Sequence, residues 1–145
     1  AAKALGATNT INYKTEDFEK VVKEGGGADV ILDMVGGDYV QKNISAARVN
    51  GRICNIAYLN GSKVELDLIY LMVKRLILTG TTLRARSSEE KADIRAAIEE
   101  RFWPKVASGA IKPVIEKVYP IAEAEAAQAD MEKGGHIGKL LLEIG

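Results

Sequence analysis

The sequence is poor in the residues that build disulfides and metal centres. Its 145 residues include one cysteine, Cys54, and one histidine, His136. A single cysteine excludes an internal disulfide and fits a reducing compartment, so we expect a cytoplasmic protein. A zinc site needs several Cys, His or carboxylate ligands, and a lone histidine offers too few. We therefore expect no metal site and assign Cys54 to the interior of a strand as a small apolar residue.

The sequence also lacks net charge and long apolar runs. Lys and Arg number 20, as do Asp and Glu, and this balance gives no attraction to nucleic acid or anionic membranes. No run of 18 apolar residues occurs, and the first residues lack the basic-then-apolar pattern of a signal peptide. We expect neither a nucleic-acid partner nor a membrane contact.

The beginning of the chain lacks a helix start signal. Residues 1–5, AAKAL, are mostly strong helix formers, and Gly6 is the residue type that commonly follows a helix end. No Ser, Thr, Asp or Asn precedes them as an N-cap. The sequence enters a helix already under way, so we expect the chain to be the C-terminal part of a longer protein.

Apolar segments of strand length alternate with amphipathic segments of helix length. The expected strands are 8–13, 28–37, 51–61, 74–83, 112–121 and 138–144, and the expected helices are 14–27, 38–50, 68–73, 87–109 and 122–135. Alternation of this kind requires crossover connections and a parallel sheet with helices on both faces. We predict an incomplete doubly wound (Rossmann-type) α/β fold, followed by a strand–helix–strand tail.

Ligands in such folds lie beyond the carboxyl ends of the strands. Here those ends are Tyr13, residues 33–37 and residues 57–61. The G-x-G-x-x-G pattern of a dinucleotide-binding turn is absent. The segment GGHIGK, 134–139, has the wrong spacing for a phosphate loop and precedes a strand instead of a helix.

Five segments together resemble one family. LGATNTINYKTEDF, ADVILDMVGG, GRICNIAYLNG, MVKRLILTGTTLRAR and HIGKLLLEI are similar, in order, to the second half of zinc-independent quinone oxidoreductases of the medium-chain dehydrogenase/reductase superfamily. The resemblance implies that 1–111 is the remainder of an NAD(P)-binding domain, whose glycine-rich loop lies upstream. It implies that 112–145 is a tail completing the catalytic domain. The implied activity is hydride transfer from NADPH to a quinone or another α,β-unsaturated carbonyl, and we expect no turnover by this chain alone.

The resemblance also implies cofactor contacts, each with a structural alternative. Tyr13 corresponds to a tyrosine beside the adenosine 2′-phosphate, or it simply packs at a strand end. Gly36 and Gly37 lie near the cofactor ribose, or they only end a strand whose turn Asp33 anchors. Ala57, Tyr58, Leu59 and Asn60 have a backbone that faces the nicotinamide, or they only form an ordinary strand-to-loop transition. The remaining implied contacts are His136, Gly138 and Lys139 in the tail, where the alternatives are a solvated loop histidine and an exposed lysine at a strand edge. No catalytic residue is assigned in this chain.

Two expectations concern sheet edges. Strand 74–83 is long and apolar and lies at the edge of the sheet, so we expect it to pair with a second copy in a homodimer. We expect strand 8–13 either to pair with the strand at 28–37 or to be separated from it by another polypeptide. Two other classes remain open for the chain, a non-catalytic nucleotide-binding or interaction module and a methyltransferase-like α/β domain.

Overall fold

The computed structural model describes all 145 residues, which form two compact units, 2–87 and 88–145. The expected domain boundary between 111 and 112 stays a prediction. None of the helices combines the length and apolar character that crossing a bilayer requires.

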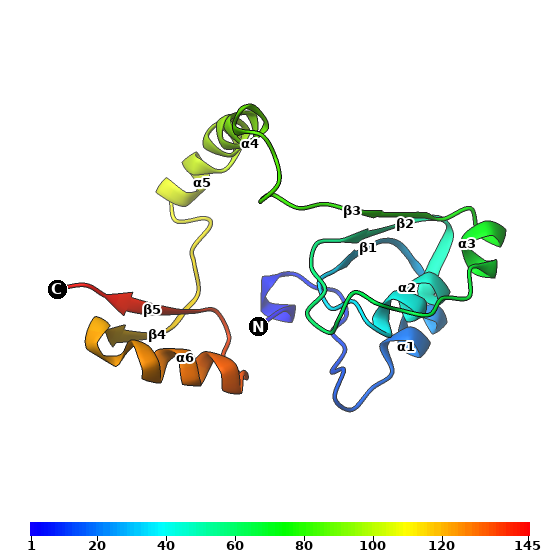
Figure 1. The fold of residues 1–145 in the computed structure, drawn as a ribbon, viewed down its shortest axis with the longest axis horizontal. Helices are drawn as coiled ribbons and strands as arrows, with labels where there is room; N and C mark the ends of the chain where they lie inside the picture. The colour runs from blue at the N-terminus through cyan, green and yellow to red at the C-terminus, as the bar shows by residue number, and fades with distance from the viewer. The chain divides into compact units, whose positions relative to one another are not determined.

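A parallel sheet forms the centre of the first unit (Figure 1). Its strands β1 (Ala28–Asp33), β2 (Ala47–Asn55) and β3 (Ile77–Gly80) lie in that order, and their carboxyl ends meet at the register Asp33–Asn55–Gly80. Helix α2 (Tyr39–Ala46) links β1 to β2 and packs on both, α1 (Phe18–Glu24) precedes β1 and packs on α2, and α3 (Ile69–Val73) precedes β3. The predicted parallel α/β fold is confirmed.

Helices cover only one face of this sheet within the unit, whereas helices on both faces were predicted. Ile44 of α2 and Ile53 of β2 are fully buried in one apolar cluster, which also holds Val40 and Ala47. On the other face, Val30 and Leu32 of β1 are about two-thirds exposed, at 69% and 66%. The period of two along β1 therefore separates a packed face from an open one.

The predicted strand at 8–13 is wrong, because these residues form no strand. Residue Asn12 closes a turn instead. Its carbonyl accepts from the amides of Thr15 and Glu16 at 2.9 and 2.8 Å, and its side chain accepts from the amide of Lys14. Asn side chains compete with extended structure by bonding nearby backbone. The predicted pairing with 28–37 is likewise absent, and β1 is an edge strand of this sheet.

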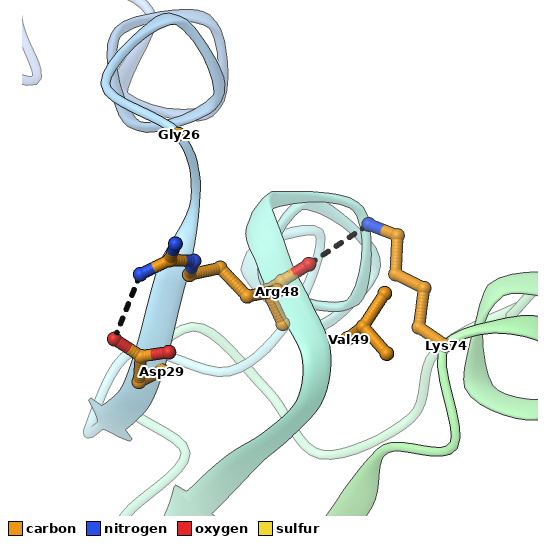
Figure 2. Close-up of a pocket in the computed structure, with 6 residues that line it drawn as sticks. Gly26, Asp29, Arg48, Val49 and Lys74 are labelled. Carbon is orange, nitrogen blue, oxygen red and sulfur yellow. Dashed lines mark hydrogen bonds and ion pairs between the residues drawn. The ribbon is translucent and has the colours of Figure 1, made fainter.

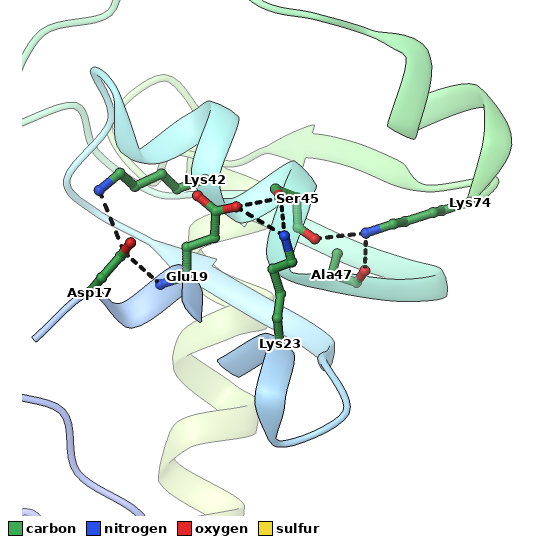
Figure 3. Close-up of polar contacts among 7 residues, drawn as sticks. All are labelled: Asp17, Glu19, Lys23, Lys42, Ser45, Ala47 and Lys74. Atoms are coloured by element: carbon green, nitrogen blue, oxygen red, sulfur yellow. Dashed lines mark hydrogen bonds and ion pairs between the residues drawn. The ribbon is translucent and has the colours of Figure 1, made fainter. Parts of the chain in front are cut away.

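The predicted helix 38–50 ends four residues early, since α2 stops at Ala46 and Ala47 is already extended. Gly51 does not end the helix but lies buried within β2. Lys74 explains the sharp end: its ammonium donates to the carbonyls of Ser45 and Ala47 at 2.7 and 2.9 Å (Figure 3). A distant cation thereby satisfies carbonyls that the end of α2 leaves free.

The first helix also begins later than its sequence suggests. The expected range began at residue 14, whereas Asp17 is the N-cap of α1, and its carboxylate accepts from the amide of Glu19 at 3.2 Å. Phe18 then stacks on Tyr39 of α2, with ring centroids 4.8 Å apart. The aromatic pair joins α1 to α2 where both helices begin.

The second unit holds two helices and the strand–helix–strand tail. Helix α4 (Ser88–Arg101) is followed by α5 (Trp103–Ala107), with the break at Phe102. The single helix expected over 87–109 is thus divided in two. Pro104 lies in the first turn of α5, the part of a helix that tolerates proline. In the tail, β4 (Ile115–Pro120), the short η2 (Ile121–Glu123), α6 (Ala124–Lys133) and β5 (Lys139–Glu143) place two strands in a parallel pair.

Candidate functional site

A buried carboxylate organises the carboxyl end of the sheet. Asp33, 4% exposed, ends β1, and its Oδ1 accepts from the amides of Val35 and Gly36 at 2.7 and 3.2 Å. Its Oδ2 accepts from the side-chain amides of Asn43 and Asn55 at 3.1 and 2.9 Å. Four donors offset the cost of burying this carboxylate, so the expected anchoring role of Asp33 is confirmed.

The same end of the sheet brings two loops together. The amides of Leu59 and Asn60 donate to the carbonyls of Met34 and Val35 at 3.2 and 2.7 Å. The amide of Gly37 donates back to Gly61 at 2.9 Å. The loop after β1, 34–37, is thus joined to the loop after β2, 56–61. This is the edge at which open parallel sheets bind ligands.

Gly36 and Gly37 are required by this loop packing. Both have positive φ, 69° and 53°. A Cβ on Gly36 would lie 2.7 Å from the Tyr58 ring, and one on Gly37 would lie 2.6 Å from the carbonyl oxygen of Asn60. The two glycines therefore allow one loop to approach the other, and their predicted role beside a cofactor ribose stays a prediction.

The loop after β2 retains free donors for a ligand. The amides of Leu59 and Asn60 are used in joining the two loops, whereas those of Ala57 and Tyr58 take no part in these bonds. Tyr58 is 49% exposed, so the loop lies at the surface of the unit. The geometry fits a group that accepts from one or two adjacent amides at the end of β2, such as a carboxamide oxygen.

Tyr13 does not lie at the end of a strand. It occupies the turn closed by Asn12 and is 67% exposed. The expectation that it packs at a strand end is wrong, because 8–13 has no strand partner. Its proposed contact with a 2′-phosphate stays a prediction.

The three tail residues lie together just before and at the start of β5. Gly138, with φ 112°, lies so close to residue 114 that a Cβ there would be 2.4 Å from the Val114 carbonyl oxygen. Next to it, the amide of Lys139 donates to the same oxygen at 2.8 Å. His136 is half-buried, and its Nδ1 is buried without a hydrogen-bond partner. Gly138 and Lys139 thus have a structural role in seating β5 beside β4.

His136 lines a cavity of about 240 Å³ between β4 and the end of α6. Beside it, the buried Tyr119 hydroxyl donates to Asp130, which also pairs with Lys133 at 3.0 Å. The Tyr119 hydrogen bond first, and Lys133 second, lower the pKa of Asp130 to about 2. The carboxylate is therefore charged at neutral pH, next to the single histidine.

Sequence reasoning missed Asn43 and Asn55 as partners of Asp33. Both are buried, at 3% and 4% exposed. For Asn55 the available signal was an amide side chain within the apolar segment ICNIA, whereas Asn43, in the mostly polar VQKNIS, carried no such signal. A buried amide needs a partner, and Asp33 is the polar residue at the facing register of β1.

Comparison with known proteins places the chain in a family. The zinc-binding dehydrogenase family profile matches residues 5–142. A 2-haloacrylate reductase from Burkholderia sp. is 30% identical over 97% of this chain and 43% of the relative, and an L-threonine 3-dehydrogenase from Symbiobacterium thermophilum is 31% identical over 97% and 39%. The quinone oxidoreductase of Thermus thermophilus, solved also with NADPH, superimposes with a TM-score of 0.80 at 26% identity over 98% of this chain and 44% of that one.

The chain belongs to the zinc-binding dehydrogenase family, within the medium-chain dehydrogenase/reductase superfamily. It spans less than half the length of the relatives described above. No three His, Cys, Asp or Glu side chains are grouped where they could hold a metal ion. The family's zinc therefore has no ligand set among these residues.

Proposed function

We propose that a protein carrying this chain transfers hydride from NADPH to a quinone or another α,β-unsaturated carbonyl. The observation that carries the proposal is the family match over 5–142, combined with a sheet edge whose loop after β2 leaves two amides free. A reductase named for 2-haloacrylate, an α,β-unsaturated acid, and a quinone oxidoreductase solved with NADPH support this substrate class and cofactor.

When bound, the nicotinamide supplies the hydride, and the contribution of this chain is to hold the ring. We assign the carboxamide to the backbone of 57–60, chiefly the free amides of Ala57 and Tyr58. Asp33 holds this loop indirectly, because it fixes 34–37, to which Leu59 and Asn60 are bonded. A fixed ring face is what productive hydride transfer needs.

Alcohol oxidation is the second candidate. The L-threonine 3-dehydrogenase and a structure of an NAD-dependent alcohol dehydrogenase, with a TM-score of 0.78 and 30% identity over 99% of this chain and 40% of that one, favour it. The reaction catalysed by the protein carrying this chain separates the two: a reductase oxidises NADPH with a quinone, and a dehydrogenase reduces NAD⁺ with an alcohol. Membership in the family favours both over a methyltransferase.

The nicotinamide end of the site can be tested on the chain itself. Reduced nicotinamide mononucleotide carries the ring and ribose but no adenosine. We expect it to shift the NMR signals of the amides at 34–37 and 57–60 in a saturable manner, with affinity in the millimolar range or weaker, because a small ligand without its anchoring half binds weakly.

Adenosine monophosphate is the matched control for that titration, since it lacks the ring, and we expect it to leave residues 57–60 unperturbed. Binding of the reduced mononucleotide elsewhere on the chain, with the signals of 57–60 unchanged, would contradict the assignment. The variant Gly37→Val should abolish the shifts, because its side chain would displace the Asn60 carbonyl oxygen.

We also propose a homodimer through strand 74–83. In the structure β3 is shorter, 77–80, and it is an edge strand of its sheet, as expected. Ile77 and Leu78 are 45% and 36% exposed, and an exposed apolar edge favours pairing. We expect light scattering to report a dimer for the chain and a monomer for Leu78→Pro, since proline interrupts an edge strand.

Lys63→Pro is the control for this substitution, because residue 63 lies in an exposed loop outside helices and strands. It should remain dimeric. A monomeric parent chain, or a Leu78→Pro variant that dimerises as tightly as the parent, would place the interface elsewhere.

A further inference from the structure

The amino ends of the strands, opposite to Asp33, border a pocket of about 610 Å³. Its lining residues include Gly26, Arg48 and Lys74, and we call it the amino-end pocket (Figure 2). A second hollow of about 250 Å³ shares Gly26, Ala47 and Lys74 with it and adds Lys23. Cationic side chains from α1, β2 and the segment before β3 therefore line one continuous region.

Positive charge in this region exceeds negative charge. Lys23 pairs with Glu19 at 3.4 Å, and Arg48 pairs with Asp29 at 3.2 Å. Lys74 bonds only neutral carbonyls (Figure 3). It also lies over the Tyr70 ring, at 5.0 Å from its centroid. The neighbouring Arg75 donates to Asn50 Oδ1 at 3.0 Å. The three cations that line the region, Lys23, Arg48 and Lys74, and the two carboxylates paired with them leave an excess of one positive charge.

The carboxyl end of α2 does not repel an anion from this pocket. A helix carboxyl end carries partial negative charge on its free carbonyls. Here the ammonium of Lys74 covers the carbonyls of Ser45 and Ala47 directly. An anion entering the pocket would meet the cation before it meets the carbonyls.

Lys74 carries a positive charge that its surroundings compensate poorly. Burial lowers its pKa, and the positive charge of Lys23 lowers it further, while Glu19 acts in the opposite direction. A bound anion would raise the pKa of Lys74 again, because it places negative charge beside the ammonium.

The backbone beside the pocket is strained. Asn50 and Arg75 have φ of 63° and 52°, values that side chains other than glycine rarely adopt. The amide of Asn50 donates to the Lys74 carbonyl at 2.7 Å, so the two strained residues hold the main chain at Lys74 against β2. Strain of this kind is concentrated at sites that position groups for a ligand.

We propose that the amino-end pocket binds a doubly charged oxyanion, a phosphate group, through Lys74, Lys23 and Arg48. Lys74, whose charge no carboxylate pairs with in the structure, is the cation that such an oxyanion would neutralise. The site is independent of the nicotinamide site, because it lies at the opposite ends of the same strands.

Inorganic phosphate is the probe, added to the 145-residue chain with sodium chloride at matched ionic strength as the reference. We expect saturable shifts in the amide signals of Gly26, Gly27 and Val49 with phosphate and none with chloride. A parallel titration with glycerol 3-phosphate tests a phosphate ester. Tighter binding of the ester than of inorganic phosphate would identify the natural ligand as a phosphate ester, and the reverse would identify it as free phosphate.

Lys74→Met and Lys23→Gln should each weaken phosphate binding about tenfold, the loss typical of one charge-assisted hydrogen bond. Lys23→Gln preserves the bonds of Lys74 to α2 and so remains informative if Lys74→Met fails to fold. Lys63→Gln removes the same charge outside the pocket and should bind as the parent does. Equal effects of chloride and phosphate, or unchanged affinity in Lys23→Gln, would overturn the proposal.

Discussion

Replacing Asp33 by leucine should lower the free energy of unfolding of the first unit by more than about 3 kcal/mol. The side chain is buried, and its loss leaves the amides of Val35 and Gly36 and the side chains of Asn43 and Asn55 without their acceptor. Each buried unsatisfied donor costs about 1–3 kcal/mol. Native-state hydrogen exchange of the β2 amides measures this loss without contributions from the second unit.

Asp29→Leu is the matched control, since it makes the same change on the same strand. Its carboxylate is exposed and pairs only with Arg48, so the cost should stay below about 1 kcal/mol. If the β2 amides of the two variants exchange hydrogen at the same rate, the four hydrogen bonds to Asp33 contribute little to stability. We also expect Asp33→Leu to lose protection of the amides at 56–61, because the carboxylate holds the loop to which they are joined.

Replacing Gly138 by alanine should destabilise the β4–β5 pair by about 3 kcal/mol, combining left-handed strain with an overpacked contact. The added Cβ would lie 2.4 Å from the Val114 carbonyl oxygen and 2.8 Å from its carbon. These backbone atoms of Val114 cannot move away from the added Cβ as the end of a flexible side chain could. The bond from the Lys139 amide to that oxygen should therefore be lost, and its exchange protection is the measurement.

Gly135→Ala separates strain from collision. Its φ is 87°, also left-handed, but nothing lies within 4 Å of the added Cβ. We expect it to cost about 1–2 kcal/mol, the strain alone. Equal losses in the two variants would show that the approach of Gly138 to Val114 is not the reason for the glycine.

Local pattern predicted most helices and strands correctly, because each pattern is carried by neighbouring residues. The apolar run 28–33 is β1, the 3.6-residue pattern before Gly134 is α6, and the segment 77–80 is an edge strand as expected. Residue 33 was expected to anchor its turn, because an Asp at a strand end commonly bonds the following amides.

Contacts between distant residues decided the rest. The end of α2 depends on Lys74, which lies 28 positions after Ala46 in the sequence. The residues near Ala46 therefore do not predict where the helix ends. The strand propensity of 8–13 had no effect, since a strand needs a neighbour and this segment has none. Similarly, Gly36 resembles a ligand-contacting glycine in sequence, and the structure shows that Tyr58 occupies the space where its side chain would be.

The sequence by itself determined a parallel α/β chain whose strands end in Asp33 and in a loop at 57–61. Periodicity and residue type suffice for this, because they reflect local backbone preference and which face is buried. Only the tertiary structure decided that Asn43 and Asn55 converge on Asp33, and that the loop amides of Ala57 and Tyr58 stay free. Both depend on the register of β1 against β2, which is set by packing across the sheet and which no single segment encodes.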